Sequence, residues 1–311
     1  MKDARLNLVP VLFIVFNRPD TTRKVFEAIR QARPPRLYIA ADGPRGGVAG
    51  EELKIQAVRE CVLGQVDWPC EVKTLFREKN LGCKVAVSSA IDWFFEHEEE
   101  GVILEDDCLP NQSFFDFCQD LLQKYRDDSR VMMISGDNFL PGRNYQNSYY
   151  FSRYCHIWGW ATWRRAWKFY DVTMRLWPEV RSRDSLLESF SKKERSALGQ
   201  TFDAVWSGKV DTWDVQWVFS VMIQHGLSIM PAVNLVSNIG FGAAAVHTKK
   251  KILPERLFQK QAMVFPLKHP SYMLCDHCAD TRTQDLFRNG FFSRMMPIIS
   301  SSTRMFLEKI F

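Results

Sequence analysis

Three absences narrow what this 311-residue chain can be. No apolar run approaches the roughly 20 residues that a membrane-spanning helix needs, since the run at residues 9–16 is short and contains Pro10. We find no secretory signal pattern, so we expect a cytoplasmic protein whose eight cysteines are reduced thiols. We also find no internal repeat and no low-complexity segment, which argues against a repeat architecture.

Two phosphate-binding motifs are missing as well. The chain has neither a Gly-x-Gly-x-x-Gly fingerprint nor the lysine-containing Walker loop, so a Rossmann dehydrogenase or a P-loop enzyme is disfavoured. It has no dense stripe of lysine and arginine, which argues against nucleic acid as a partner. The net charge of +5 still suits an anionic ligand such as a nucleotide. Cys275 and Cys278 form a lone Cys-x-x-Cys pair without the second half of a zinc site, and we expect the pair to be structural or incidental.

The first 135 residues alternate between short apolar runs and helical patterns. The runs predict strands at residues 9–16, 37–41, 72–76, 102–104 and 131–134. Apolar residues at helical spacing predict helices between them, at residues 51–63, 83–98 and 114–125 and also shortly after residue 20. Strands that alternate with helices in this way predict an α/β fold with a mainly parallel sheet flanked by helices.

Polar residues stand where the predicted strands end. They are Asn17, Arg18, Asp42, Asn80 and the acidic triplet Glu105, Asp106 and Asp107. Because ligands of parallel sheets bind at the carboxyl ends of the strands, we expect these residues to surround one site. Lys84 follows shortly after the third strand, where it either reaches a phosphate or lies on a solvated helix face.

The acidic triplet carries the most chemical information. Three adjacent carboxylates repel one another unless water, protons or a cation compensates their charge. Mg²⁺ and Mn²⁺ prefer oxygen ligands and commonly take one or two carboxylates together with substrate phosphates. The triplet therefore predicts a binding site for a metal ion and a diphosphate. The alternative is an ordinary acidic loop.

The composition changes after residue 148. Residues 149–170 are rich in aromatic side chains, among them Trp158 and Trp160. Flat aromatic rings suit the apolar faces of sugars, and packing in the core is the alternative. Asn138, which follows the predicted strand at residues 131–134, is a further candidate for a contact with the sugar or the acceptor.

The remaining third of the chain adds a helix start and a glycine loop. Residues 180–210 are predicted to be helical, and another helix opens near residue 212, with Asp211 or Thr212 as its N-cap. Gly240 and Gly242 lie in a later loop and are candidates for contact with the sugar or the acceptor. Residues 291–311 are apolar and basic, so they either dock on the body of the protein or contact a membrane surface.

The order of these motifs resembles that of the GT-A nucleotide-sugar glycosyltransferases. The shared features are a strand ending in an acidic triplet, Asn80-Leu81-Gly82 before the preceding helix, Trp213-Asp214 at a helix start, and a late glycine loop followed by a histidine. The triplet is similar to the metal-binding triplet of the N-acetylglucosaminyltransferase I group, and the chain looks like bacterial relatives of that group. The resemblance covers residues 8–250. It implies a GT-A type, Rossmann-like domain at 1–250 and a helical C-terminal extension at 251–311.

The resemblance also implies roles for individual residues. Asp107 would bind Mn²⁺ or Mg²⁺ directly, and Asp106 would contact the ribose or reach the metal through water. His247 would resemble the late histidine that completes the metal site in many of these enzymes. Asp42 would meet the nucleobase, and Arg18 would lie near the nucleotide.

The catalytic base is expected at the predicted helix start. Asp214 matches the family position, but Val215 stands where the family has a second acid, so Asp211 remains an alternative. With such a base, the resemblance implies an inverting transfer of a sugar from a nucleoside diphosphate sugar, with a UDP-sugar expected. The acceptor would be a glycan or glycolipid in polysaccharide biosynthesis. The alternatives are a sugar nucleotidyltransferase and a non-catalytic carbohydrate-binding protein.

Overall fold

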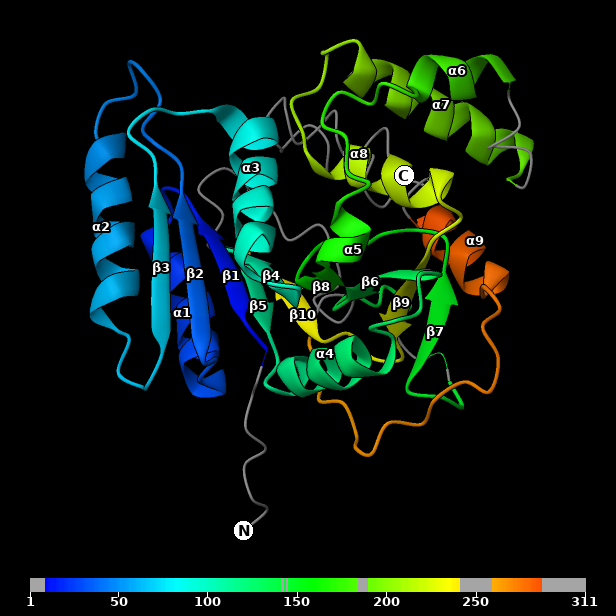
Figure 1. The fold of residues 1–311 in the computed structure, drawn as a ribbon, viewed down its shortest axis with the longest axis horizontal. Coiled ribbons are helices and arrows are strands. Elements are labelled where there is room, and N and C mark those ends of the chain that lie inside the picture. Colours follow the sequence, from blue (N-terminus) through cyan, green and yellow to red (C-terminus); the bar gives the residue numbers. More distant parts are fainter. Residues whose placement is uncertain (1–8, 141–142, 144, 184–189, 241–258, 287–311) are drawn as a thin grey trace.

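The computed structural model describes residues 9–140, 143, 145–183, 190–240 and 259–286, and it is built around one large sheet (Figure 1). The strands are β1 (Val11–Val15), β2 (Arg36–Ala41), β3 (Glu71–Phe76), β4 (Glu100–Glu105), β5 (Cys108–Pro110), β6 (Val131–Ser135), β7 (Tyr149–Ser152), β8 (Trp160–Trp163), β9 (Leu227–Pro231) and β10 (Val236–Asn238). Eight of them form the sheet in the order β3-β2-β1-β4-β8-β6-β9-β7. Only β7 and β8 run against the others in this sheet. The predicted α/β class with a mainly parallel sheet is therefore confirmed.

Helices cover both faces of this sheet. They are α1 (Pro19–Ala32), α2 (Glu51–Gly64), α3 (Gly82–His97), α4 (Ser113–Lys124), α5 (Arg164–Trp167), α6 (Trp177–Arg183), α7 (Lys192–Trp206), α8 (Asp214–Ile223) and α9 (His277–Leu286). Alternation along β1 separates two cores, since Phe13 packs with residues of α1 and Leu12 packs with residues of α3. Figure 1 shows α1 and α3 on opposite sides of the sheet. A strand that is covered on both faces has apolar residues at successive positions, which explains the continuous apolar run in the sequence.

Strand β8 lies between the two parallel parts of the sheet. It pairs antiparallel with β4 on one side and with β6 on the other. The sequence pattern predicted no strand in residues 149–170, where the structure has β7 and β8. Aromatic residues favour strands when tertiary packing buries them, and here both strands enter the cores.

A second, two-stranded sheet brings a distant loop to the end of β4. Strands β5 and β10 pair antiparallel, and Asn238 stands opposite Cys108. The loop that follows Asn238 therefore begins beside the acidic triplet. Helix α8 starts at Asp214 with Trp213 as its N-cap, so the predicted N-cap at Asp211 or Thr212 is wrong.

The described part of the C-terminal segment lies against the body. Lys260 Nζ donates to the carbonyl of Pro110 at 2.8 Å, and the Met263 amide donates to Ser113 Oγ at 2.8 Å. The predicted extension at 251–311 is described only for residues 259–286, so its boundary stays a prediction. Residues 291–311, the predicted docking or membrane segment, lie outside the described residues. Among the helices that the structure describes, none has both the length and the apolar character needed to cross a bilayer.

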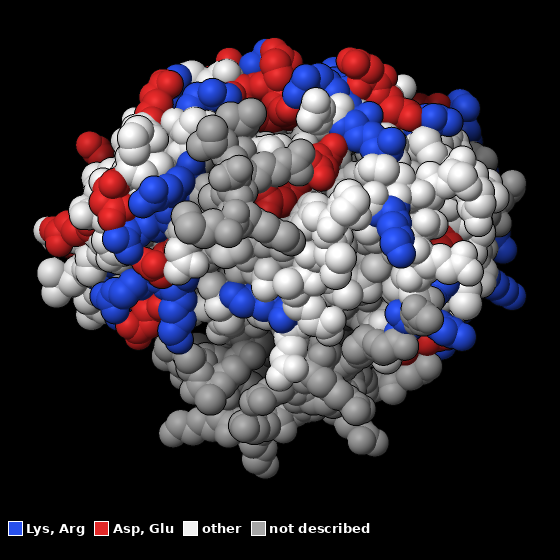
Figure 2. All heavy atoms as spheres, turned by 90° about the horizontal axis from the view of Figure 1, so that it is seen from below, with Lys and Arg blue, Asp and Glu red and all other residues white. Residues whose placement is uncertain are grey.

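Charged side chains of both signs share the face of the molecule seen from below. In Figure 2, basic and acidic groups are interspersed along the left and upper margins, and a broad uncharged area lies beside them. The net charge of +5 is thus not gathered into one continuous basic band on the described part of this face.

Candidate functional site

A cavity of about 440 Å³ opens at the carboxyl ends of the first four strands. Predicted site residues from these strand ends line it together with one residue before α8: Arg18, Asp42, Asn80, Glu105, Asp106, Asp107 and Asp211. Parallel strands that end at the same edge of the sheet bring these distant segments together. The structure therefore gathers into one cavity predicted site residues that lie up to 193 positions apart in the printed sequence, from Arg18 to Asp211.

The acidic triplet forms the inner wall of this cavity. Glu105 is the last residue of β4 and pairs with Ile14 of β1. The Phe16 amide donates to Asp106 Oδ2 at 3.2 Å. Arg18 Nη1 lies 2.6 Å from Asp107 Oδ2 and 3.6 Å from Asp106 Oδ1. The loop after β1 thus holds one cation against two of the three carboxyl groups.

Burial and mutual repulsion dominate the electrostatics of the triplet. Burial, together with the charges of Asp107 and Asp106, raises the pKa of Glu105 to about 8. Burial, followed by the charge of Asp107, also raises the pKa of Asp106 to about 7. Arg18 opposes both effects, but a single guanidinium does not neutralise three carboxyl groups. The wall therefore has a deficit of positive charge that a divalent cation would remove.

The loop after β10 touches the predicted metal ligand. The Ile239 amide donates to the carbonyl of Asp107 at 2.8 Å. A Cβ atom built on Gly240 would lie 2.4 Å from Asp107 Oδ2, so only glycine fits at this position without a shift. The predicted site residue Gly240 is thus placed beside Asp107. Gly242 and His247 lie outside the described residues.

The loops after β2 and β3 are tied to each other. Both carboxylate oxygens of Asp42 accept from the Leu81 amide, at 3.1 and 3.0 Å. Asn80 Nδ2 donates to the carbonyl of Gly43 at 2.9 Å. Asp42 therefore holds the start of α3 as well as lining the cavity.

Two predicted nucleotide contacts do not line the cavity. Asn17 Nδ2 donates to Glu51 Oε1 at 2.8 Å and so anchors the start of α2. Lys84 stands in the first turn of α3 and is also absent from the cavity wall. The solvated helix face, the alternative weighed for Lys84, agrees better with this placement.

The two candidate bases differ in their surroundings. Asp211 is exposed and lines the cavity, and a Cβ atom built on Gly82 would lie 3.0 Å from its Oδ2. Asp214 is only 4% exposed. Its Oδ1 accepts hydrogen bonds from Thr212 Oγ1 and, at 2.9 Å, from the Val215 amide. Burial raises the pKa of Asp214 to about 6 even though these hydrogen bonds lower it.

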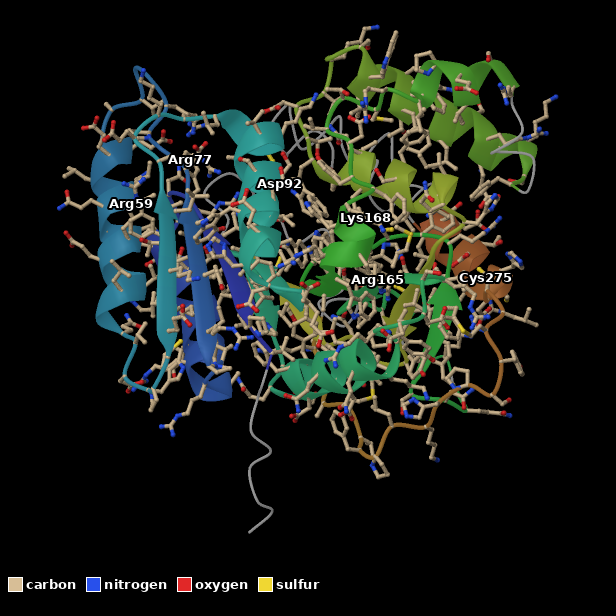
Figure 3. The ribbon with its side chains drawn as sticks, viewed as in Figure 1. Arg59, Arg77, Asp92, Arg165, Lys168 and Cys275 are labelled. Atoms are coloured by element: carbon tan, nitrogen blue, oxygen red, sulfur yellow. The ribbon has the colours of Figure 1, made fainter. Side chains whose placement is uncertain are left out.

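Sequence reasoning missed two cations of the cavity wall. Arg45 pairs with Glu51, and Arg77 Nη2 donates to Ser89 Oγ at 2.8 Å. Figure 3 labels Arg77 at the carboxyl end of β3, beside Arg59. The sequence could have indicated both residues by their position after a strand end. Arg77 directly follows a predicted strand, and Arg45 follows the Asp-Gly-Pro turn.

Burial argues against two of the predicted sugar or acceptor contacts, Trp160 and Asn138. Trp160 is 1% exposed, and its ring lies 5.7 Å from that of Trp213 in a stacked arrangement, so it belongs to the core. Asn138 is buried and donates through Nδ2 to the carbonyl of Pro231 at 2.7 Å. Trp158 is half-buried and packs edge-on against Phe139 at 5.3 Å. None of the three lines the cavity described above.

Comparisons with known proteins add little to this picture. No family model and no curated protein matches the chain. Among solved structures, apo-UDP-glucose pyrophosphorylase has a TM-score of 0.38 at 9% identity, over 75% of this chain and 93% of that one. A UDP-glucose pyrophosphorylase in complex with UDP-glucose has a TM-score of 0.28 at 11% identity, over 52% of this chain and 70% of that one. At these values neither likeness assigns a family or a function to the chain.

Proposed function

We propose that this chain is a metal-dependent glycosyltransferase that uses a nucleoside diphosphate sugar, with a UDP-sugar as the first donor to test. The observation that supports the proposal is the convergence of acidic and basic residues from four strand ends on one cavity. Its volume of about 440 Å³ falls within the usual range of ligand pockets, roughly 300–1,000 Å³. The cations Arg18, Arg45 and Arg77 suit a diphosphate, and the acids suit a metal and a hydroxyl proton.

The end of β4 fits Mn²⁺ or Mg²⁺. The carboxyl groups there are oxygen donors, and burial and mutual repulsion raise the pKa values of Glu105 and Asp106, so a divalent cation would favour their charged forms. When bound, such an ion supplies charge neutralisation for the leaving diphosphate. Asp107 would hold the ion directly, and Asp106 would stand behind it. Gly240 adds no side chain beside Asp107 Oδ2, so on this side the loop leaves the carboxylate in place.

We assign the catalytic base to Asp211. A base must reach the acceptor hydroxyl, and Asp211 is exposed on the cavity wall, whereas Asp214 is buried behind it. The carboxylate of Asp211 takes the hydroxyl proton while the acceptor oxygen bonds to C1 of the sugar. The bond from C1 to the diphosphate breaks, and the nucleoside diphosphate leaves with its electron pair. Asp214 would act as a positioning residue, because it binds Thr212 and Val215 in the turn that carries Asp211.

The structure weakens one of the alternatives. A carbohydrate-binding protein that uses the tryptophan segment would need exposed rings, but Trp160, Trp163 and Trp167 are buried. A sugar nucleotidyltransferase would use the same cavity with a nucleoside triphosphate and a sugar phosphate. Release of pyrophosphate from such a pair would assign that reaction in place of glycosyl transfer.

The first test is the thermal stability of the full chain with UDP, GDP, CMP or ADP, each with and without Mn²⁺. A ligand at about 100 times its Kd stabilises the folded state by roughly 2.7 kcal/mol. We expect a stabilisation by UDP that depends on Mn²⁺ and is lost in Asp107→Asn. Asp20→Asn, whose side chain is 92% exposed on α1, is the matched control and should behave as the unchanged protein.

Two outcomes would contradict the proposal. If no nucleotide shifts the unfolding temperature, the cavity is not a nucleotide site. If the shift is the same without Mn²⁺ and in Asp107→Asn, the site binds a nucleotide but the metal assignment is wrong. Turnover of the stabilising donor, followed as release of its nucleoside diphosphate in the presence of acceptor glycans, then tests the transfer itself.

A further inference from the structure

A second group of ligand-type side chains lies far from the cavity, at the start of α9. Within the described part of the chain, Cys275, His277 and Asp280 bring one potential ligand atom each to within 4.8 Å of one another. Figure 3 shows Cys275 and Arg77 towards opposite edges of the sheet, Cys275 near β7 and the cavity residue Arg77 near β3. The group is therefore separate from the proposed donor site.

Local backbone structure holds these residues together. Cys275 forms a β-bridge with Phe151 of the edge strand β7, and the Asp276 amide donates to the carbonyl of Phe151 at 2.8 Å. Helix α9 begins at His277, so Asp280 lies three residues further on the same side of the helix. The sequence spacing alone hid the group, because a Cys-x-His pair and an aspartate one helical turn later do not form a familiar motif.

Asp280 is already oriented towards Cys275. It is 3% exposed, and its Oδ1 accepts from Ser152 Oγ at 2.6 Å. Its Oδ2 accepts from the Arg153 amide at 3.2 Å and from Cys275 Sγ at 3.1 Å. Hydrogen bonds to the other oxygen of a carboxylate fix its orientation, as they do around ligating carboxylates in metal sites.

The nearest cation to Asp280 is Arg153. Arg153 Nε lies 3.6 Å from Asp280 Oδ2, which is longer than a hydrogen bond. The Arg153 guanidinium also lies 4.1 Å from the centre of the Phe190 ring, where it makes a cation–π contact. On the other side, Cys275 Sγ lies 3.1 Å from Asp280 Oδ2, so an ion that took the place of the thiol proton would meet both atoms.

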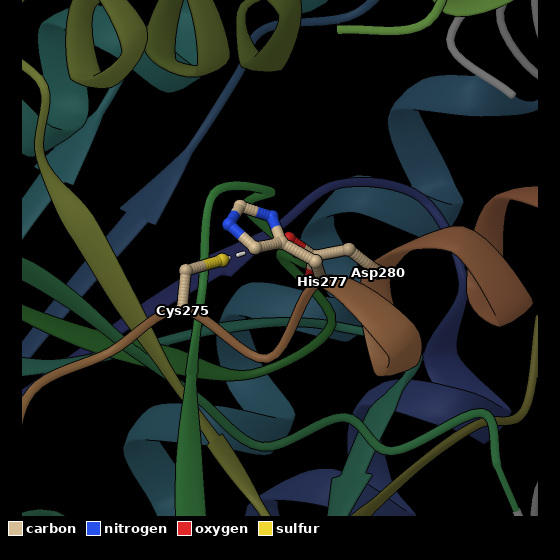
Figure 4. A group of neighbouring side chains, drawn as sticks. All are labelled: Cys275, His277 and Asp280. Carbon is tan, nitrogen blue, oxygen red and sulfur yellow. Dashed lines mark hydrogen bonds between the residues drawn. The ribbon is translucent and has the colours of Figure 1, made fainter. Parts of the chain in front are cut away.

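The donor atoms suit zinc among the common metals. A thiolate, an imidazole and a carboxylate are the three ligand types that Zn²⁺ takes in proteins. Around one tetrahedral ion these atoms would lie roughly 3.5 Å apart, given Zn–S and Zn–N distances of about 2.3 and 2.0 Å. The imidazole stands over the pair formed by Cys275 and Asp280 (Figure 4), and because His277 is exposed its ring can turn to close the remaining gap.

We propose that Cys275, His277 and Asp280 bind a single zinc ion that fastens the start of α9 to strand β7. On binding, the Cys275 thiol releases its proton to solvent, and the ion replaces that proton between Sγ and Asp280 Oδ2. Water fills the fourth position of the tetrahedron. Cys278 lies outside the group of atoms within 4.8 Å and is not a ligand in this site. The proposal does not depend on the proposed glycosyltransferase activity.

Cobalt is the probe that tests this site, because a thiolate bound to Co²⁺ gives a charge-transfer absorption band in the near ultraviolet. The full chain is stripped with a chelator and titrated with Co²⁺, and Zn²⁺ is then added to displace it. We expect a band that saturates at one equivalent and disappears with Zn²⁺. Cys275→Ser should abolish the band, and His277→Asn should weaken Co²⁺ binding by about tenfold or more.

Matched variants separate this site from others that could bind cobalt. Cys70→Ser removes another half-buried thiol and should leave the band unchanged. Asp107→Asn should also leave it unchanged, which keeps the outcome independent of the metal proposed in the cavity. His277→Asn alters an exposed side chain, so it tests the site even if Cys275→Ser fails to fold. A missing band, or a band that persists undiminished in His277→Asn, would overturn the proposal.

Discussion

The two aspartates that flank Trp213 lie three positions apart, yet they meet very different surroundings. Asp211 faces the cavity and solvent, whereas Asp214 is buried and accepts hydrogen bonds from Thr212 and Val215. A buried acid with a raised pKa is often read as a catalytic group. Here the geometry argues otherwise, because a molecule in the cavity would reach Asp211 on the wall and not the buried carboxyl group of Asp214.

Substitution of these aspartates separates the two roles. We expect Asp211→Asn to lower kcat by about 10²- to 10⁴-fold, the usual contribution of a general base, with an unchanged Kd for the donor. Asp214→Asn should lower kcat less, because Asn can still accept the hydrogen bonds from Thr212 and Val215. Steady-state kinetics and donor titration check both expectations. If Asp211→Asn keeps its kcat while Asp214→Asn loses it, the base is Asp214.

At the scale of elements, the site is made by strand ends and by one loop that returns from far along the chain. Strand β10 pairs with β5 and delivers Gly240 to Asp107. This long-range pairing accounts for the glycine: any side chain at that position would enter the space of the carboxylate.

We therefore expect Gly240→Ala to weaken metal-dependent donor binding. Its Cβ would lie 2.4 Å from Asp107 Oδ2, so either the loop or the carboxylate has to move. The Kd for UDP in the presence of Mn²⁺ should rise by about tenfold, the effect of disturbing a group next to a metal ligand. Gly46→Ala is the matched control, because nothing lies within 4 Å of its added Cβ. Equal Kd values in the two variants would show that the loop does not shape the site.

Local sequence patterns predicted part of this arrangement of elements. Apolar runs bounded by polar residues located the ends of β1 to β4, and the rule that ligands bind at such ends located Arg18, Asp42, Asn80 and the triplet. The same rule, applied more strictly, would have found Arg77. What local patterns could not reveal is pairing between distant segments. The position of Trp160 in the core follows from the insertion of β8 between β4 and β6, and nothing within residues 149–170 encodes those partners.

At the scale of the whole molecule, the buried acids oppose folding at neutral pH. Burial raises the pKa of Glu105 to about 8 and that of Asp214 to about 6, so the folded state holds protons that the unfolded chain has already released. Their contribution to stability is complete below the unfolded pKa near 4 and is lost as the pH rises through the folded values. His156 acts in the opposite sense. Burial lowers its pKa to about 3, so its contribution is lost as the pH falls below about 6.5.

Because these effects oppose one another, the pH dependence is best tested on one group at a time. Asp214→Asn removes an acid whose pKa is raised by about two units, which corresponds to about 3 kcal/mol at full ionisation. The free energy of unfolding of the variant, relative to the unchanged protein, should therefore increase by about that amount between about pH 4 and pH 7. Urea unfolding at several pH values measures the difference, with Asp20→Asn as the exposed control that should show no such trend. A difference that stays constant with pH would show that burial does not raise the pKa of Asp214.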